Sequence, residues 1–516
     1  MLSILLLFLA GLAALLVVLR HSRRASSSSF KSVALVVLGD IGRSPRMLYH
    51  AQSFAANGYR TQIVAYRGSA PPKQLAENPL VSFVYLPTSL GFISGLPRPL
   101  FLLLAPFKVV LGAFGLLKAL VWTLETPPAL LFLQNPPAIP TLPGVKLASF
   151  LTGSKVIIDW HNTGYSVLAL RLGEQHPVVR VARFIEHLFG RSAYAHLCVS
   201  DAMKAQLQRE AKLSGQVVTF HDRPPSHFRR LSDKEQHELF SRLSVFSTLS
   251  FPSSPSSSTS PLSNSANTTR FSHPLSPTHF TSPSGSPLPS RPALLVSATS
   301  WTADEDFSLL LRALKLYEKA ARAFAEGKRG WKGESERRRG RLPRVVVVIT
   351  GKGAGKEQFE KEVEGLEKGW EWVRVRTAWL AIEDYPKLLG SADLGISLHT
   401  STSGIDLPMK VVDMFGCGLP ALALDFPCLD ELVKHNQNGR VFQDVEGLAD
   451  QLIDLLLDFP RPFPSSLDRL RDGIRSASYG GEGEGEKSAR WGSWKKNWVE
   501  VVLPLLQHVG GQAGGQ

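Results

Sequence analysis

Cysteine is scarce in this chain of 516 residues, which contains only three. Cys198, Cys417 and Cys428 make a poor disulfide framework, and their positions show none of the ligand spacings that are typical of metal sites. This scarcity excludes a small secreted fold that depends on disulfides. It favours a reducing compartment.

Charged side chains are nearly absent from residues 245–290, where Ser and Pro dominate and Arg270 is the only formally charged residue. Such a composition cannot bury enough apolar surface to fold. We therefore predict a disordered insert over residues 245–292, between an N-terminal domain at 31–230 and a C-terminal domain at 293–470. Residues 471–516 are expected to form a flexible segment followed by a C-terminal helix.

Charge is also missing from residues 2–19, a leucine-rich run of eighteen that is just long enough to cross the hydrocarbon layer of a bilayer as a helix. Arg20, Arg23 and Arg24 follow it, and positive charge favours the cytosolic side. We predict a membrane anchor at residues 1–24, with the domains that follow in the cytosol. A cleaved signal peptide is the alternative.

A second apolar region, residues 100–124, is interrupted by Pro106, Lys108 and Lys118. This pattern suits a helix that lies in the membrane interface better than one that spans the bilayer. A core helix with two lysines that reach out to solvent explains the same pattern, and the two interpretations stay open.

The formal net charge of +14 raises the question of nucleic acid binding, but much of the excess lies in residues 328–344, which hold eight Lys or Arg against two Glu. The sequence contains no recognised signature for reading or stacking bases, which argues against a nucleic acid partner. Anionic lipid attracts such a loop equally well, and a solvated loop is the plainer interpretation. The roles of this loop and of the Ser/Pro insert stay open.

The rest of the chain alternates short apolar runs with helical patterns. An apolar run at 33–38 is followed by a tight turn, a helix that Ser44 caps and Gly58 ends, and the next strand at 59–66. Further strands are expected at 129–133, 156–161, 196–200 and 217–221, and in the second half at 293–298, 344–350, 372–377, 393–399 and 419–424. The pattern predicts an α/β protein with two doubly wound domains, each built on a parallel sheet.

Ligands of such sheets bind beyond the carboxyl ends of the strands, so the turns that follow strands are candidate sites. In the first domain these turns contain Gly39, Asp40, Gly42 and Arg43 after the first strand and Asp159 and His161 after a later one. In the second domain, Gly351, Lys352 and Gly353 follow a strand. We expect the two domains to face each other, so that one cleft collects these turns.

Residues 398–420 combine a strand end, a loop of Ser, Thr and Gly, and a helix start with Pro408 as the expected first helical residue. Free backbone N–H groups at a helix start favour a phosphate, and Lys410 adds a positive charge. Ser403, Asp406 and Asp413 supply groups that bind sugar hydroxyls. The stretch predicts a pocket for a sugar nucleotide, and an ordinary strand and helix joined by a Ser-rich loop is the alternative.

Residues 351–356 read Gly-Lys-Gly-Ala-Gly-Lys, which invites comparison with a nucleoside triphosphate loop. The glycine spacing differs from that motif, and Glu357 stands where a Ser or Thr is needed for magnesium. An ATPase is therefore excluded. The glycines instead favour close approach of the backbone to a diphosphate, with Lys352 adding charge.

Several ordered motifs resemble one enzyme family. They read GDIGRSPRM, DWHNTGYS, HDRPP, TSWTADEDFSLLLRAL, VITGKG, a long run from AWLAIEDYP to MFGCGLP, and ELVKHNQNG. Over about residues 33–225 and 293–460 the chain is similar to the β-1,4-mannosyltransferases of the dolichol-linked oligosaccharide pathway. The resemblance implies two facing Rossmann-like domains of the GT-B type at the cytosolic face of the endoplasmic reticulum membrane. It also implies transfer of mannose from GDP-mannose to dolichyl-diphosphate-linked chitobiose with inversion at the anomeric centre.

Inversion in one displacement needs a base beside the acceptor hydroxyl and positive charge or amide dipoles at the departing diphosphate. Asp40, His161 and Asp159 end strands of the first domain and are the candidate bases, with Asp40 and His161 favoured equally. The donor is assigned to Gly351, Lys352, Gly353, Ser403, Asp406, Lys410 and Asp413. The loop that faces the acceptor or its diphosphate is assigned to Gly39, Gly42 and Arg43.

The chain departs from the wider GT-B pattern in one respect. Many retaining relatives have two glutamates with seven residues between them, whereas six residues lie between Asp406 and Asp413. We expect no tightly bound metal or cofactor, since lysine and helix termini balance the diphosphate, and stimulation by a divalent cation stays open. Two alternatives remain: a membrane-bound transferase that uses a UDP-sugar, and a catalytically silent scaffold that recruits other transferases of the pathway.

Overall fold

The computed structural model describes residues 31–87, 98–125, 127–251, 279–282, 284–301, 305–327, 340–401, 403–460, 465–479 and 493–507. The predicted anchor at 1–24, the centre of the Ser/Pro insert and most of the basic loop lie outside these residues. The chain divides into two compact units, Met1–Asp222 with Trp494–Gln516 and Arg223–Ser493. Each is described by itself.

The first unit is built on a seven-stranded parallel sheet in the order β3-β2-β1-β4-β5-β6-β7. Its strands are β1 (Ser32–Asp40), β2 (Arg60–Tyr66), β3 (Val81–Leu86), β4 (Leu130–Asn135), β5 (Lys155–Trp160), β6 (Ser192–Cys198) and β7 (Ser214–Thr219). Apolar runs such as Val33–Val37 are fully buried because helices cover both faces of the sheet. The strand order reverses between β1 and β4, which makes the carboxyl ends of these strands the expected binding edge.

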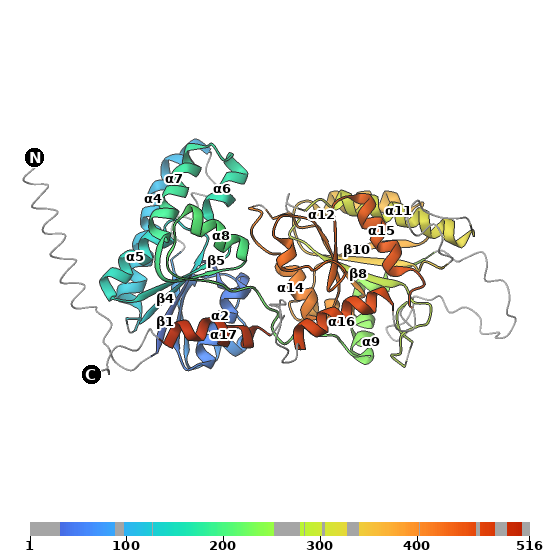
Figure 1. Cartoon of the computed structure of the whole chain (residues 1–516), viewed down its shortest axis with the longest axis horizontal. Helices are drawn as coiled ribbons and strands as arrows, with labels where there is room; N and C mark the ends of the chain where they lie inside the picture. Colours follow the sequence, from blue (N-terminus) through green and yellow to red (C-terminus); the bar gives the residue numbers. More distant parts are fainter. Residues whose placement is uncertain are drawn as a thin grey trace, which may run out of the picture. The chain divides into compact units, whose positions relative to one another are not determined.

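The helices of the first unit lie on both sides of its sheet (Figure 1). They are α2 (Pro45–Ala56), α3 (Lys73–Ala76), α4 (Arg98–Lys118), α5 (Thr141–Thr152), α6 (Gly164–Leu172), α7 (Pro177–Gly190), α8 (Asp201–Glu210) and α17 (Trp494–Gln507), together with the short turns η1 (Ile41–Arg43) and η3 (Ala119–Thr123). None of the helices in the described ranges is both long enough and apolar enough to cross a bilayer.

The C-terminal helix α17 belongs to the first unit, although it follows the second unit in the sequence. Trp494 and Trp498 are buried in the same core as β1 and α2. Their indole nitrogens donate to Ser53 Oγ at 2.9 Å and to His50 Nδ1 at 3.1 Å. The sequence placed this helix in a separate C-terminal segment, because its partners lie more than four hundred residues away.

The second unit contains a six-stranded parallel sheet in the order β10-β9-β8-β11-β12-β13. The strands are β8 (Ala293–Ala298), β9 (Val345–Thr350), β10 (Val373–Ala378), β11 (Leu394–Ser397), β12 (Ala421–Leu424) and β13 (Gly439–Phe442). The order reverses between β8 and β11, so the loops after β8, β9 and β11 meet at the expected binding edge.

Two cores cover the two faces of this second sheet. Helices α11 (Phe307–Ala325), α12 (Lys356–Glu367) and α15 (Val445–Leu456) pack on one face. The other face is covered by α9 (Asp233–Arg242), α10 (Ser244–Ser247), α13 (Asp384–Ser391) and α14 (Met409–Gly416). Helix α16 (Ser466–Tyr479) contributes to both cores and crosses the predicted domain end at residue 470.

The ends of the predicted Ser/Pro insert are part of this unit. Phe246, Leu249 and Phe280 are buried together in the second core, and the rings of Phe240 and Phe246 lie 4.7 Å apart. The low charge of residues 245–290 suggested disorder throughout, but the few aromatic residues near both ends supply enough apolar surface to anchor them to the fold.

Candidate active site

Asp40 ends strand β1 and holds the following turn in shape. Its Oδ1 accepts from the Gly42 N–H at 3.0 Å, and its Oδ2 accepts from the Ser69 N–H at 2.9 Å and from Ser69 Oγ at 2.8 Å. Burial raises the pKa of Asp40, but the hydrogen bonds from Ser69 and Gly42 and the charge of Arg43 lower it by more, so the net shift is downward. Both oxygens already have donors within the protein.

Gly42 is required at this turn because a Cβ there would lie 2.6 Å from the Ser69 carbonyl oxygen. Gly39 has no comparable restriction, since its nearest neighbour would be 3.9 Å away. The Arg43 side chain is largely exposed and lies 3.5 Å from Asp40. The turn therefore presents one exposed cation, paired with Asp40, at the carboxyl edge of the sheet.

Arg46, in the first turn of α2, organises the centre of the first unit. Its guanidinium donates to both oxygens of Asp159, at 2.9 and 2.8 Å, and to Asp222 Oδ1 at 2.7 Å. Burial opposes the charge of this arginine, but the two carboxylates raise its pKa above the ordinary value. Arg46 and Asp222 lie in sequence motifs but are not among the predicted site residues, because the residues of the two pairs are 113 and 176 positions apart in the chain.

His161 contacts the same carboxylate. Its Nε2 lies 2.8 Å from Asp159 Oδ2, and its side chain is 22 % exposed, whereas the Asp159 side chain is fully buried. Burial raises the pKa of Asp159, but Arg46 and His161 lower it well below the ordinary value. In neutral His161 with Nε2–H donated to Asp159, the Nδ1 lone pair is left to accept a proton. The structure therefore joins two of the predicted residues into one Asp–His pair.

A second histidine, His50, also lies beside Asp159. Its Nδ1 accepts from the Trp498 indole, and its Nε2 lies 3.4 Å from Asp159 Oδ2. Complete burial lowers the pKa of His50 to about 4, although hydrogen bonding and the charge of Asp159 act in the opposite direction. His50 is therefore a neutral, structural neighbour of the pair.

The loop that carries His161 is fixed by Glu186 of α7. The Glu186 carboxylate accepts from Asn135 Nδ2 at 2.7 Å, from the Gly164 N–H at 3.0 Å and from the Tyr165 N–H at 3.1 Å. The last two are free donors in the first turn of α6, so an acidic side chain there also complements the helix dipole. Burial raises the pKa of Glu186 in spite of these bonds.

In the second unit, the loop after β9 packs directly on the loop after β8. Gly351 has φ of 148°, and a Cβ there would lie 1.8 Å from the Thr299 carbonyl oxygen. At Gly353 a Cβ would lie 2.5 Å from the Ser300 carbonyl oxygen. Only glycine allows this approach, and it leaves Lys352 on an exposed tip.

Lys410 is paired with an acidic side chain. Its Nζ forms an ion pair with Glu305, whose other oxygen accepts from Thr299 Oγ1 at 2.5 Å. Both side chains are mostly buried, and the backbone of Glu305 bridges to His399 at the end of β11. Glu305 was not predicted as a partner of Lys410, because the two residues are 105 positions apart in the sequence. Helix α14 begins at Met409, so Pro408 precedes the helix and is not its first residue as predicted.

Asp406 sits in a network of polar side chains in the same loop. Ser401 Oγ and Ser403 Oγ donate to its Oδ1, the latter at 3.2 Å, and His399 Nε2 lies 3.8 Å from its Oδ2. Burial raises the pKa of Asp406, but His399 and the serines lower it by more. The structure therefore brings Ser403, Asp406 and Lys410 to the edge where the loop with Lys352 lies.

Asp413 lies apart from this network. It is in the second turn of α14, where it accepts from the Tyr385 hydroxyl of α13 at 3.4 Å. This contact turns the carboxylate toward α13. Asp406 and Asp413 thus lie on either side of the helix start, as predicted from the sequence, and a role of Asp413 in donor binding stays a prediction.

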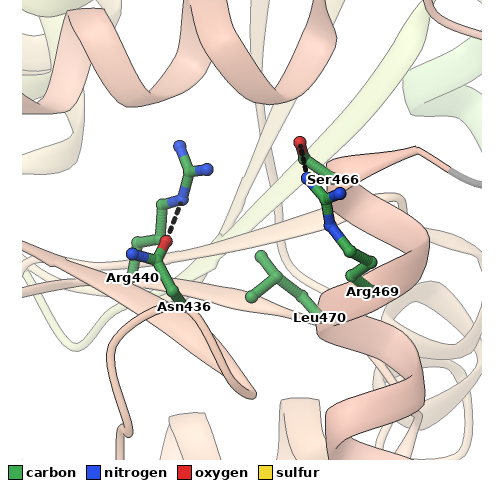
Figure 2. Close-up of a pocket in the computed structure, with 5 residues that line it drawn as sticks. All are labelled: Asn436, Arg440, Ser466, Arg469 and Leu470. Carbon is green, nitrogen blue, oxygen red and sulfur yellow. Dashed lines mark hydrogen bonds between the residues drawn. The ribbon is translucent and has the colours of Figure 1, made fainter.

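A pocket of the second unit lies elsewhere on its surface. Figure 2 shows Arg440 donating to Asn436 and Arg469 donating to Ser466 around Leu470. Asn436 precedes β13, so this pocket opens at the amino end of a strand, whereas the predicted donor residues lie at the carboxyl ends. Arg440 is also paired with Asp454 at 2.8 Å. The pocket is therefore not the predicted donor site.

The two parallel sheets, with candidate site residues at the carboxyl edge of each, are typical of one class of protein. Residues 42–222 match the family model described as "Glycosyl transferase 4-like domain", and residues 334–458 match "Glycosyl transferases group 1". The fold is similar to that of a crystal structure of a glycosyltransferase from Rickettsia africae, with a TM-score of 0.56, 11 % sequence identity, and coverage of 94 % of this chain and 100 % of that one. The protein is a glycosyltransferase with two Rossmann-like units of the GT-B type.

Sequence comparison defines the family more narrowly. The chain is 42 % identical over 480 residues, 92 % of each chain, to the human protein named chitobiosyldiphosphodolichol beta-mannosyltransferase. It is 38 % identical over 485 residues to an Arabidopsis thaliana protein named UDP-glycosyltransferase TURAN, over 92 % of this chain and 97 % of that one. The chain belongs to the chitobiosyldiphosphodolichol beta-mannosyltransferase family, which confirms the resemblance found in its motifs.

Proposed function

We propose that the protein transfers one mannose from GDP-mannose to chitobiosyl-diphosphodolichol and forms a β-1,4 linkage. The observation that carries the proposal is membership of the mannosyltransferase family over more than nine-tenths of the chain. The product would be the first mannosylated precursor of an N-linked glycan. No tightly bound cofactor is needed for this chemistry.

His161 acts as the general base in this proposal. The acceptor hydroxyl attacks the anomeric carbon, its proton passes to Nδ1 of His161, and the carbon–oxygen bond to the diphosphate breaks so that GDP leaves with the electron pair. Asp159 stays ionised, orients the ring through Nε2 and stabilises the imidazolium. Arg46 holds Asp159 in place from the opposite side.

Asp40 is the weaker candidate for the base. A base needs a free lone pair within reach of the substrate, whereas both oxygens of Asp40 accept hydrogen bonds from the protein. Its lowered pKa also weakens its affinity for a proton. We assign Asp40 and Gly42 to the shape of the turn, and Arg43 to charge beside the acceptor diphosphate.

On the donor side, Lys352 and the backbone N–H groups of Gly351 and Gly353 balance the diphosphate of GDP. Ser403 and Asp406 bind hydroxyls of ribose or mannose. Lys410 joins them when a phosphate competes with Glu305 for its ammonium group. In this proposal Glu305 neutralises Lys410 until a donor phosphate replaces it.

A donor panel tests the proposal directly. Full-length protein in detergent is incubated with a chitobiosyl-diphospho-lipid and, in separate reactions, with GDP-mannose, UDP-glucose and UDP-N-acetylglucosamine. We expect one hexose to be added only from GDP-mannose. Transfer from a UDP-sugar alone would instead support the second candidate, which the name of the Arabidopsis relative favours. Binding of no sugar nucleotide at all would support a silent scaffold for other transferases.

We also propose that the protein is a single-pass protein of the endoplasmic reticulum membrane with both units in the cytosol. The apolar run at 2–19, the arginines that follow it and a lipid-linked acceptor support this topology. Asn267-Thr268-Thr269 is a formal glycosylation sequon and reports on the side of the membrane. In microsomes it should stay unmodified, and a glycan on Asn267 would contradict the topology.

A divalent cation is not essential to this chemistry, because lysine and backbone amides already neutralise the diphosphate. Activity should survive a chelator, with at most partial stimulation when the cation is restored. Complete loss of activity in the chelator, restored by the cation, would overturn this part of the proposal.

A further inference from the structure

Four helices of the first unit form one layer on a single face of its sheet. Helix α5 packs against α4 on one side and against α7 on the other, and α7 packs against α6. These helices lie together on one side of the unit in Figure 1. Their outer surface contains many exposed apolar side chains.

The outer face of α7 is apolar, although it is directed away from the core. Val178, Val181, Phe184 and Leu188 follow one face of this helix at helical spacing and are all exposed, Phe184 to 65 %. The opposite face contains Val179, Glu186 and Gly190, which are buried. An amphipathic helix normally turns its apolar face toward the core and its polar face toward solvent. Helix α7 differs, because it also has apolar side chains on its solvent-facing side.

The neighbouring helices extend this surface. The exposed apolar side chains are Val167 and Leu170 of α6, Leu147 and Phe150 of α5, and Phe107, Val110 and Phe114 of α4. Scattered apolar residues are normal on a protein surface, but exposed apolar side chains on four adjacent helices of one layer indicate an interaction site. We refer to the exposed apolar residues of α4, α5, α6 and α7 as the apolar helix face.

Basic side chains predominate around the apolar helix face, although Glu174 is exposed in the loop between α6 and α7. Arg171, Arg180 and Arg183 lie beside it on α6 and α7, and Lys108 and Lys118 lie on α4. The only acidic residue in the sequence of the four helices is Glu186, which is buried under the loop of His161. A second copy of the chain would bring cations against cations, whereas an anionic lipid surface complements them.

We propose that the apolar helix face lies on an anionic lipid bilayer, with Phe184 and its neighbours inserted at the level of the head groups and the cations against lipid phosphates. The inference deepens the proposed function and rests on it, since the acceptor proposed above is carried by a membrane lipid. None of the four helices can span a bilayer, so the contact is interfacial.

This contact would also position the reaction. Helix α6 begins three residues after His161, and α7 supplies the Glu186 carboxylate that binds the first turn of α6. The helices that contact lipid are thus the ones that fix the loop of the proposed base. A diphosphate at the bilayer surface would meet that loop without leaving the membrane.

Site-specific fluorescence on full-length protein in vesicles tests this inference. The three native cysteines are buried, so a single Phe184→Cys variant can be labelled with an environment-sensitive dye. Ile382→Cys is the matched control, since Ile382 is apolar and 77 % exposed but lies in the second unit. We expect a blue shift and quenching by nitroxide-labelled lipid at position 184, stronger in vesicles with phosphatidylserine, and neither change at 382.

Aqueous emission at position 184 while the protein is bound to the vesicles would overturn the inference. So would shielding of position 184 without lipid that increases with protein concentration, because that result indicates a second copy. Neither outcome depends on activity, so a failure here is distinct from a failure of the proposed function.

An activity measurement gives a second, independent test. The double variant Val181→Asp with Phe184→Asp should lose at least about tenfold in the rate with a vesicle-borne acceptor and keep its rate with a short-chain, water-soluble acceptor. Ile382→Asp should change neither rate. Equal rates of the double variant and the native protein on vesicles would contradict the inference. The thermal midpoint shows whether the double variant is folded.

Discussion

At the residue scale, His161 and Asp159 have different tasks although they lie two positions apart. His161 reaches solvent and can exchange a proton with a substrate, whereas Asp159 is buried and acts through the histidine. His161→Ala should therefore lower kcat by about 10²–10⁴-fold with little change in stability. Asp40→Asn is the matched control and should mainly lower the thermal midpoint. If Asp40→Asn rather than His161→Ala lowered the rate in single-turnover assays, Asp40 would be the base.

His50 makes the stability of the first unit depend on pH. Its pKa is about 4 in the folded protein and near 6.5 in the unfolded chain, so between these values the unfolded state binds more protons. Stability contributed by neutral His50 is present above pH 6.5 and is lost as the pH falls toward 4, by roughly 3 kcal/mol.

The variant His50→Gln isolates this contribution. Glutamine can accept the hydrogen bond from Trp498 but does not titrate in this range. Urea unfolding at intervals between pH 4 and 7 should show a flatter pH dependence for the variant than for the native protein. Identical slopes would mean that folding does not change the proton affinity of His50, which contradicts the lowered pKa.

Arg46 and Glu305 show why part of the site could not be predicted from the sequence. Asp159, His161, Lys352 and Lys410 could be proposed from the sequence, because each lies at the end of a strand or in the turn or helix start that comes after one. The partners that fix two of them are remote: Arg46 is 113 residues from Asp159, and Glu305 is 105 residues from Lys410. A local sequence pattern predicts a strand and the turn that follows it. Pairs of side chains that are distant in the sequence become visible only in the folded structure.

At the element scale, Glu186 is the main support of the loop that carries His161. Glutamine at this position has one acceptor oxygen and would place an amide group against backbone donors. Glu186→Gln should cost about 1–3 kcal/mol and increase hydrogen exchange at the Gly164 and Tyr165 amides. Unchanged protection of these two amides would show that the loop is held by other contacts.

The loop between β9 and α12 offers a comparison between two glycines. Gly351→Ala should destabilise the second unit by about 2–4 kcal/mol and weaken donor binding, since its Cβ would overlap the Thr299 carbonyl at a φ that only glycine adopts readily. Gly355→Ala, with its nearest neighbours at 3.9 Å, should change neither quantity measurably. Calorimetry with GDP measures donor binding, and equal effects of the two variants would contradict the proposed role of Gly351.

Most strands could be predicted because they are continuous apolar runs in a buried parallel sheet. The expected strand at 293–298 coincides with β8, and the one at 344–350 differs from β9 by one residue. Strands β3 and β13 were missed. They lie at the edges of the two sheets, where Val81–Val84 and the middle of Gly439–Phe442 are only partly buried, so the apolar signal is weaker.

At the scale of the whole molecule, the chain returns to its first unit through α17 after completing the second. The burial of Trp494 and Trp498 against α2 ties the end of the sequence to the element that carries Arg46. No periodicity in the sequence indicates such a return, because it depends on contacts between the two ends of the chain. Removal of α17 should therefore reduce activity through Arg46 and Asp159, although neither lies in the deleted segment.

The stereochemistry of the product tests the central claim most directly. In a single displacement assisted by His161, the mannose of GDP-mannose must change its anomeric configuration. Nuclear magnetic resonance of the sugar released from the lipid product should show one β-linked mannose on the chitobiose. An α-linked mannose would contradict the single-displacement account.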